Sequence, residues 1–215
     1  MRQYNLPKNP FVGLRPFESQ ESILFFGRDD HVDELTQRLY KHRFLAVVGS
    51  SGSGKSSLVR AGLIPRLRAG LMVSDRDQWK IAIMKPGGKP LENLTLALLK
   101  VLSQNQDRTS VENFLSNLQS FGVKAIDEYF GEILDECNGN LLLLVDQFEE
   151  LFRFGLYTEN ELAKEEAKAF ASIMLDLANK SRLPIYVVIT MRSDFLGDCD
   201  AFYGLPEALN HSQLL

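Results

Sequence analysis

A short glycine-rich stretch, which follows an apolar run and precedes a helical pattern, constrains this fold more than any other part of the sequence. Residues 44–48 (FLAVV) are branched and apolar, and they predict a buried strand. From Lys55 onward, apolar residues recur at helical spacing. The stretch GSSGSGKS at 49–56 is therefore a strand-to-helix turn, and its glycines permit the positive φ angles that a tightly curled loop needs.

A curled loop at a helix N-terminus directs backbone N–H groups inward, and the helix dipole adds positive charge, so the turn predicts a phosphate cradle. Gly49-x4-Gly54-Lys55-Ser56 is the P-loop, or Walker A, pattern, in which the lysine reaches the β- and γ-phosphates and the serine holds Mg²⁺. A flexible Gly/Ser linker is the alternative, but a linker would not lie between a buried strand and an amphipathic helix. The residues expected to line the cradle are Gly49, Ser50, Ser51, Gly52, Ser53, Gly54, Lys55, Ser56 and Ser57.

The composition is that of an ordinary globular domain. The chain has 215 residues, 45% hydrophobic and 24% charged, which is enough for one substantial core. The net charge of −4 gives no electrostatic sign of nucleic-acid binding. Cys137 and Cys199 have no CxxC spacing and suit a reducing compartment, and no apolar run is long enough to span a membrane. We therefore expect a cytoplasmic protein with no membrane or nucleic-acid partner.

Strand-like and helix-like segments alternate along the chain. Besides 44–48, the apolar runs predict buried strands at 81–85, 141–146 and 185–190, and helical spacing predicts helices at 29–41, 91–104, 111–119, 122–136 and 159–180. The tail from Ser193 is mixed and short. Continuous apolar strands that alternate with helices predict an α/β three-layer sandwich, in which helices cover both faces of a parallel sheet.

We divide the chain into an N-terminal arm at 1–28 and a core at 29–215. The arm is punctuated by prolines and contains four phenylalanines that need burial, so we expect it to be ordered and not a linker. These phenylalanines are Phe11, Phe17, Phe25 and Phe26.

The second half of the expected site follows the strand at 141–146, which ends in Asp146. In open parallel sheets ligands bind at the carboxyl ends of the strands, so this carboxylate is expected near the P-loop. There it can hold Mg²⁺ or its waters, as a Walker B aspartate does. Glu149 and Glu150 follow and are candidates for orienting the attacking water. Alternatively, the acids only decorate a helix N-terminus, where the helix dipole favours them.

The strand at 185–190 leads into Thr190, Arg192 and Asp194. Arg192 could bind the γ-phosphate through charge-assisted hydrogen bonds. A solvated loop arginine is the alternative interpretation. Arg153 is a weaker candidate of the same kind.

Five motifs in order resemble the nucleotide-binding domain of the novel-STAND family, and the resemblance runs from about Asn9 to the end of the chain. The motifs are NPFVGLRPF…FFGRDD, VVGSSGSGKSSLVRAGLIPRLRAG, KPGGKPLENLTLAL, LLLLVDQFEELFR and VVITMRSDFLGDC. STAND proteins are signal-transduction ATPases related to AAA+ and NLR-type switches. The resemblance implies ATP or ADP with Mg²⁺ as cofactors, and an ASCE/AAA-like sheet in which strand 185–190 lies between strands 44–48 and 141–146.

The resemblance also implies roles for individual residues. Gly27 and Arg28, in Phe26-Gly27-Arg28, match the family's hydrophobic-Gly-Arg box near the nucleotide, and Arg192 matches its sensor arginine. One position departs from the wider P-loop ATPase pattern, because Gln147 and not a glutamate follows the Walker B aspartate. The STAND pattern places the acids two or three residues later, and which of them activates water stays open.

Family members usually carry an effector domain, a winged helix and repeats beside this module. We expect those parts to lie outside this sequence as partner domains, so that the chain is a truncated module without a lid, and other copies of the chain are a further candidate partner.

The leading interpretation is a nucleotide-dependent switch that binds Mg-ATP and hydrolyses it slowly. A nucleotide-filled interaction scaffold without significant turnover is the main alternative. A P-loop kinase would need an arginine-rich lid, and an ABC-type ATPase would need an LSGGQ-like signature; neither is seen in the sequence. No NKxD-type motif indicates GTP, and the choice of adenine rests on the resemblance.

Overall fold

A parallel β-sheet forms the centre of the molecule in the computed structural model, which describes residues 13, 15–70, 76, 78–102 and 107–214. The strands are β1 (Phe44–Gly49), β2 (Gln78–Met84), β3 (Gly139–Val145), β4 (Ile185–Arg192) and a two-residue β5 (Gln213–Leu214). Their spatial order is β2-β3-β4-β1-β5, and every neighbouring pair is parallel. Strand β4 therefore lies between β1 and β3, which confirms the expected strand order.

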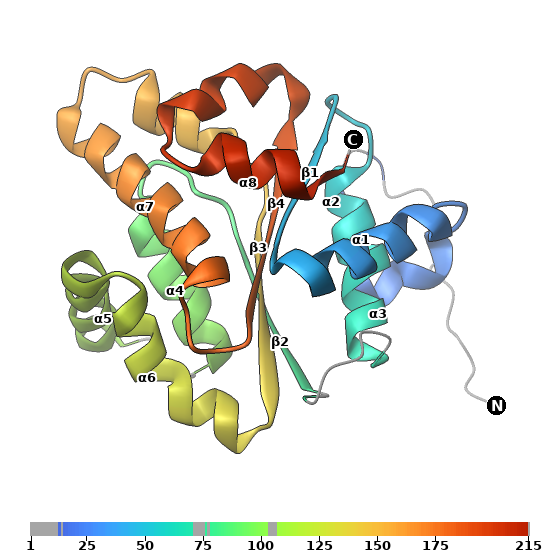
Figure 1. Ribbon diagram of the computed structural model, residues 1–215, viewed down its shortest axis with the longest axis horizontal. Coiled ribbons are helices and arrows are strands. Elements are labelled where there is room, and N and C mark those ends of the chain that lie inside the picture. Colours follow the sequence, from blue (N-terminus) through green and yellow to red (C-terminus); the bar gives the residue numbers. More distant parts are fainter. Residues whose placement is uncertain (1–12, 14, 71–75, 77, 103–106, 215) are drawn as a thin grey trace.

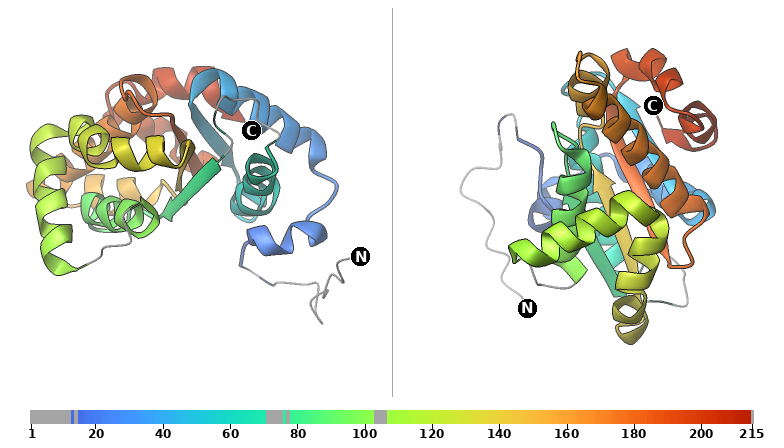
Figure 2. Two further views of the ribbon diagram at one scale, coloured as in Figure 1. Left: turned by 90° about the horizontal axis from the view of Figure 1, so that it is seen from below. Right: turned by 90° about the vertical axis from the view of Figure 1, so that its left-hand side faces the viewer.

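Helices cover both faces of this sheet, so the molecule has three layers (Figure 1; two further views in Figure 2). One face carries α1 (Asp29–His42) and a continuous helix composed of α2 (Lys55–Ser57), the π-helical segment η2 (Leu58–Leu63) and α3 (Ile64–Arg68). The other face carries α4 (Pro90–Leu102), α5 (Arg108–Phe121), α6 (Val123–Glu136) and α7 (Glu161–Asn179). The expected α/β three-layer sandwich is confirmed.

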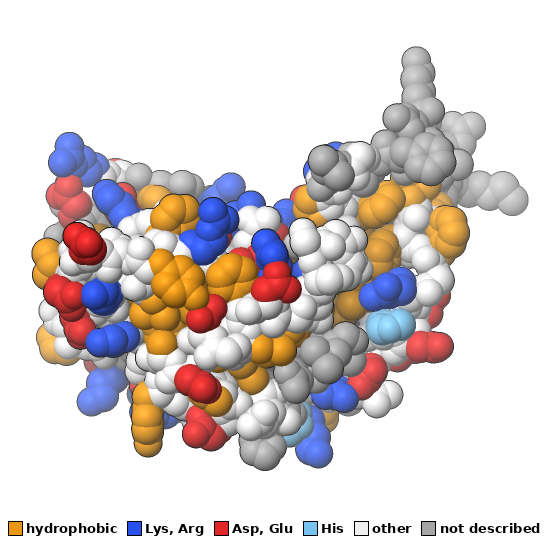
Figure 3. Space-filling model, turned by 90° about the horizontal axis from the view of Figure 1, so that it is seen from above, with side chains coloured by type: hydrophobic (Ala, Val, Ile, Leu, Met, Phe, Trp, Pro, Cys, Tyr) orange, Lys and Arg blue, Asp and Glu red, His pale blue; other side chains and the backbone are white. Residues whose placement is uncertain are grey.

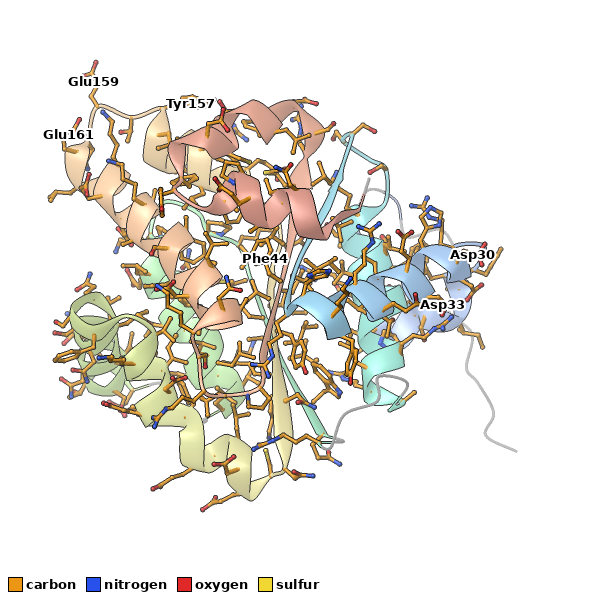
Figure 4. The ribbon with its side chains drawn as sticks, viewed as in Figure 1. Asp30, Asp33, Phe44, Tyr157, Glu159 and Glu161 are labelled. Atoms are coloured by element: carbon orange, nitrogen blue, oxygen red, sulfur yellow. The ribbon has the colours of Figure 1, made fainter. Side chains whose placement is uncertain are left out.

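The alternation of side chains along β1 divides the core into two clusters. Leu45 and Val47 pack with apolar residues of α1, η2 and α3. Phe44, Ala46 and Val48 belong to the larger cluster on the α4–α7 face. Phe44, which is labelled in Figure 4, lies at the start of β1 between the two helical layers. Because all five of these side chains are buried, the loop that follows β1 is anchored to a fixed strand.

Several ordered elements lie where the sequence predicted none. They are the 3₁₀ helices η1 (Ser19–Leu24) and η4 (Ser193–Ala201), the π-helical segment η3 (Phe152–Leu156) and α8 (Leu205–Ser212). The tail from Ser193 thus contributes two helical elements and the short strand β5, and its Leu205 and Leu209 join the larger core cluster. None of the helices in the described parts of the chain is long and apolar enough to cross a membrane.

The N-terminal arm is attached to the helix that follows the P-loop. The backbone N–H of Phe17 donates to the Ser57 hydroxyl over 3.1 Å. Phe17 and Phe25 are half-buried and their rings lie 6.1 Å apart, as expected for an ordered arm. The expected burial of Phe26 is wrong, because its side chain is 81% exposed, and Phe11 lies outside the described residues.

Candidate functional site

The loop between β1 and α2 is curled as the sequence predicts. Gly52 and Gly54 have φ angles of +75° and +86°, in the left-handed region that favours glycine. The Lys55 ammonium donates to the carbonyl oxygens of Gly49 (2.9 Å) and Ser50 (2.7 Å), so the lysine closes the loop over its own first residues. This lysine is the first residue of α2, where the dipole of the helix favours an anion.

Burial and nearby charged side chains shift the pKa of Lys55. Burial lowers the pKa of the ammonium, because the charged form loses solvation. The carboxylate of Glu149 raises this pKa, and the guanidinium of Arg192 lowers it. Both residues were candidates from the sequence, and both interact electrostatically with the P-loop lysine.

Asp146 lies at the end of β3 and is only 2% exposed. Its Oδ1 atom accepts hydrogen bonds from the hydroxyls of Ser56 and Thr190, each over 2.6 Å. Its Oδ2 atom accepts a hydrogen bond from Arg60 Nη2 over 2.9 Å. The Ser56–Asp146 hydrogen bond confirms the expected proximity of the Walker A serine and the Walker B aspartate. Thr190 reaches the same carboxylate because its strand, β4, lies beside β3.

The two glutamates after Asp146 face different neighbours. The carboxylate of Glu149, which is 9% exposed, accepts the backbone N–H of Arg192 over 3.4 Å. The carboxylate of Glu150 accepts the backbone N–H of Gly87, in the loop between β2 and α4, over 3.1 Å. The structure thus separates two residues that the sequence left equivalent: Glu149 binds the backbone of β4, and Glu150 binds the loop after β2.

Arg192 is the residue opposite Gly49 in the register of β1 and β4, so the strand pairing brings it to the start of the P-loop. Its guanidinium forms an ion pair with Asp194 and lies 5.6 Å from the ring centroid of Phe195. Its Nε atom is buried and has no hydrogen-bond partner among the described residues. Arg153, the weaker candidate, is exposed in η3, and it takes no part in the hydrogen bonds that the Asp146 carboxylate forms with Ser56, Arg60 and Thr190.

Gly27 and Arg28 directly precede α1, and Arg28 lies near the P-loop. Gly27 has a φ angle of +79°, and Arg28 is the N-cap residue of the helix. A cavity of about 270 Å³ lies between this helix start and the P-loop, and Arg28, His31, Gly49 and Lys55 contribute to its lining. The Arg28 Nε atom is buried without a hydrogen-bond partner among the described residues.

The sequence of the chain matches one protein family over nearly its whole length. Residues 10–215 match the family described as Novel STAND NTPase 1. The chain belongs to this family. Comparison with curated protein sequences found no match.

Two solved structures resemble the fold of this STAND NTPase. A chain of the HORMA–CdnC–Trip13 complex of Escherichia coli MS115-1 aligns with a TM-score of 0.52 and 18% identity, over 93% of this chain and 66% of that one. A Walker-type ATPase of Pyrococcus abyssi aligns with a TM-score of 0.50 and 17% identity, over 88% of this chain and 51% of that one. At these identities the likeness concerns the fold alone.

The residues of the STAND NTPase site fit a nucleotide with a divalent cation. Among the described residues, the buried Nε atoms of Arg28 and Arg192 are donors without hydrogen-bond partners, and an anion is a ligand that such donors can bind. The Lys55 ammonium donates to the backbone carbonyls of Gly49 and Ser50, which phosphate oxygens can replace. The Ser56 hydroxyl and the Asp146 carboxylate supply the hard oxygen ligands that Mg²⁺ prefers.

Charged side chains of both signs are mixed on the upper face of the molecule. In Figure 3, which views the molecule from above, basic, acidic and hydrophobic side chains are interspersed, and neither sign of charge predominates on this face. An anion at the P-loop would therefore be attracted by the loop backbone, by Lys55 and by the nearby arginines, and not by the general charge of this face.

Sequence reasoning missed Arg60, the ion-pair partner of Asp146. A signal was available, because Arg60 follows Ser56 by four residues on the same helix, and residues at this spacing lie on one helical face. A side chain one turn beyond the Walker A serine can therefore reach the same carboxylate as the serine.

Proposed function

We propose that this STAND NTPase module binds Mg-ATP, hydrolyses it slowly, and thereby controls an effector in a larger cytoplasmic signalling protein. The observation that carries the proposal is the convergence of the Ser56 and Thr190 hydroxyls on the buried Asp146 carboxylate, beside a glycine loop that Lys55 closes. Asp146 and Ser56 would hold Mg²⁺, and Lys55 with the loop N–H groups would bind the phosphates.

Magnesium bound at these oxygens would neutralise part of the phosphate charge. Of the two glutamates, Glu149 is the better candidate for orienting the attacking water, because its carboxylate interacts with Lys55 whereas that of Glu150 binds Gly87 in another loop. Arg28 and Arg192 are proposed as further phosphate or nucleotide contacts because each has a buried donor without a partner among the described residues.

Slow turnover follows from two features of the site. Gln147 occupies the position directly after Asp146, so water activation must come from a residue further along the loop. Arg192 is engaged with Asp194, and a γ-phosphate contact would require it to leave this partner. In P-loop NTPases a missing arginine finger alone lowers the rate by about 10³–10⁵.

A nucleotide-filled interaction scaffold is the second candidate, and one observation favours it. Both glutamates after Asp146 accept backbone N–H groups, of Arg192 and of Gly87, and these hydrogen bonds would hold the carboxylates away from a water molecule. A P-loop kinase is disfavoured by the sheet, because β4 separates β1 from β3, whereas the kinase-like sheet would place them side by side.

Steady-state phosphate release from Mg-ATP by the purified chain tests the proposal. We expect turnover far below the roughly 1–100 s⁻¹ typical of kinases. Glu149→Gln should remove the residual turnover, and Glu150→Gln, the matched control, should retain it. Turnover near one per second that Lys55→Ala abolishes would contradict the switch interpretation. Nucleotide binding with no detectable turnover would support the scaffold instead.

A further inference from the structure

Arg60 lies between the metal-binding carboxylate and the N-terminal arm. Its Nη2 atom donates to Asp146 Oδ2 over 2.9 Å, and its Nη1 atom donates to Glu18 Oε1 over 2.7 Å. The side chain of Arg60 is 16% exposed, and that of Glu18 is 42% exposed. One guanidinium is thus shared between the buried Asp146 at the end of β3 and the half-exposed Glu18 of the arm.

The arm has a second attachment close to the same place. Glu18 precedes η1 as its N-cap residue, and the neighbouring Phe17 N–H binds the hydroxyl of Ser57. Ser57 follows the Walker A serine directly. Displacement of Arg60 would therefore act on an arm that is already held beside the P-loop helix.

The hydrogen bonds of the Arg60 guanidinium are incomplete. Its Nε atom is buried and has no hydrogen-bond partner within the described part of the chain. The carboxylate of Asp146 is by contrast fully engaged, with both oxygens accepting hydrogen bonds. A buried carboxylate needs a counter-charge, and here Arg60 supplies it.

A divalent cation at Asp146 would compete with Arg60 for this carboxylate. Two cations that share one buried carboxylate repel each other strongly, because screening by water is weak there. The Arg60 guanidinium can move away from Asp146 and still have a charge partner, because the Glu18 carboxylate accepts a hydrogen bond from its other terminal nitrogen.

We propose that Arg60 is a positioning residue that couples docking of the N-terminal arm through Glu18 to occupation of Asp146 by the metal. The inference rests on the proposed function, because it takes Asp146 as the carboxylate that binds Mg²⁺. Metal with nucleotide weakens the Arg60–Asp146 pair and strengthens the Arg60–Glu18 pair, so the arm is held more tightly. Binding linkage is reciprocal, so a docked arm raises the affinity for the metal by the same factor.

Calorimetric ADP titrations of the full chain, with Mg²⁺ and with EDTA, test this coupling. The ratio of the two affinities is the magnesium enhancement. Glu18→Gln should lower this enhancement about fivefold, the low end of typical couplings, because Arg60 then stays with Asp146. Arg60→Gln should raise the enhancement, because no cation competes with the metal. Glu18→Gln should have no additional effect in the Arg60→Gln background.

Arg66→Gln and Asp33→Asn are the matched controls. Arg66 lies six residues further along the same chain of helices and forms an ion pair with Asp33 of α1, and none of the hydrogen bonds of Asp146 involves either residue. Both controls should keep the wild-type enhancement. Because Arg60→Gln removes the partner of a buried carboxylate and could fail to fold, Arg60→Lys and the half-exposed Glu18→Gln provide independent variants.

Hydrogen exchange of residues 15–24 gives a second measurement. Mg-ADP should increase protection of this segment in the wild type and leave it unchanged in Arg60→Gln. A wild type that binds no nucleotide would overturn the proposed function together with this inference. A normal wild-type enhancement that Glu18→Gln and the Arg60 variants share, with arm protection unaffected, would overturn the inference alone.

Discussion

Two buried threonines differ in what their hydroxyl groups contribute. Thr190 is 1% exposed, and its hydroxyl donates to Asp146 and accepts the backbone N–H of Gln147 over 3.0 Å. Thr95 of α4 is 0% exposed, and its Oγ1 atom has no hydrogen-bond partner among the described residues. At this scale a site residue is distinguished by its hydrogen bonds and not by its burial.

Substitution of each threonine by valine should therefore have opposite consequences. Thr190→Val removes one donor from Asp146 and leaves the Gln147 N–H without its partner, so it should lower the free energy of unfolding by about 1–3 kcal/mol. Thr95→Val removes a buried hydroxyl that lacks a partner and should be neutral or stabilising. Urea denaturation measures the free energy of unfolding of both variants. Equal destabilisation by the two substitutions would show that the Thr190 hydrogen bonds do not contribute to stability.

The sequence predicts the site residues unequally, for physical reasons. Ser56 and Asp146 could be expected together because a P-loop and a strand end meet at one edge of a parallel sheet. The different surroundings of Glu149 and Glu150 could not be expected, because they depend on the turn in which Gln147 takes a φ angle of +59°. A non-glycine residue in the left-handed region leaves no reliable sequence signal.

At the scale of elements, the P-loop helix packs against α1 at a glycine. A Cβ atom added at Gly62 would lie 2.6 Å from Val32 Cγ2 of α1 and 3.4 Å from Phe25 Cε1 of the arm. Such a distance to Val32 is too short for a real contact, so with a larger residue either the Val32 side chain or the packing of α1 on the P-loop helix must shift. The same helix supplies Lys55, Ser56 and Arg60, so its position sets the geometry of the site.

Gly62→Ala should consequently lower the free energy of unfolding by about 1–3 kcal/mol, as overpacking does. Gly131 of α6 is the matched control, because its added Cβ would lie at an ordinary 3.7 Å from Leu183 Cδ2. Alanine there should stabilise the protein by up to about 1 kcal/mol through helix propensity. Thermal denaturation of both variants checks this, and a gain of stability in Gly62→Ala would contradict the close packing.

Elements with strong periodicity were predicted well and those without it were missed. The strand at 141–146 is a continuous apolar run, and β3 is found there as Gly139–Val145. The region after Ser193 forms two short helices, which end at Ala201 and Ser212. Contacts with the larger core cluster stabilise these helices more than the periodicity of their apolar residues does. Tertiary packing, which a local pattern does not report, decides such elements.

At the scale of the whole molecule, the strand order brings the separate motifs together. Because β4 lies between β1 and β3, the ends of three strands place Gly49, Asp146 and Arg192 along one edge of the sheet. The arm reaches the same edge through Glu18 and Arg60. The architecture thus joins residues from both ends of the sequence around one proposed nucleotide site.

Calorimetric titration of Mg-ATP into the wild type and Lys55→Ala tests the central claim most directly. The wild type should bind, and the variant should bind about tenfold to a hundredfold more weakly, since charge-assisted contacts contribute about 1.5–3 kcal/mol. Lys168→Ala, which removes an exposed lysine paired with Glu165 on α7, should bind like the wild type. Equal affinity of Lys55→Ala and the wild type, or no binding by the wild type, would contradict the assignment of the P-loop as a nucleotide site.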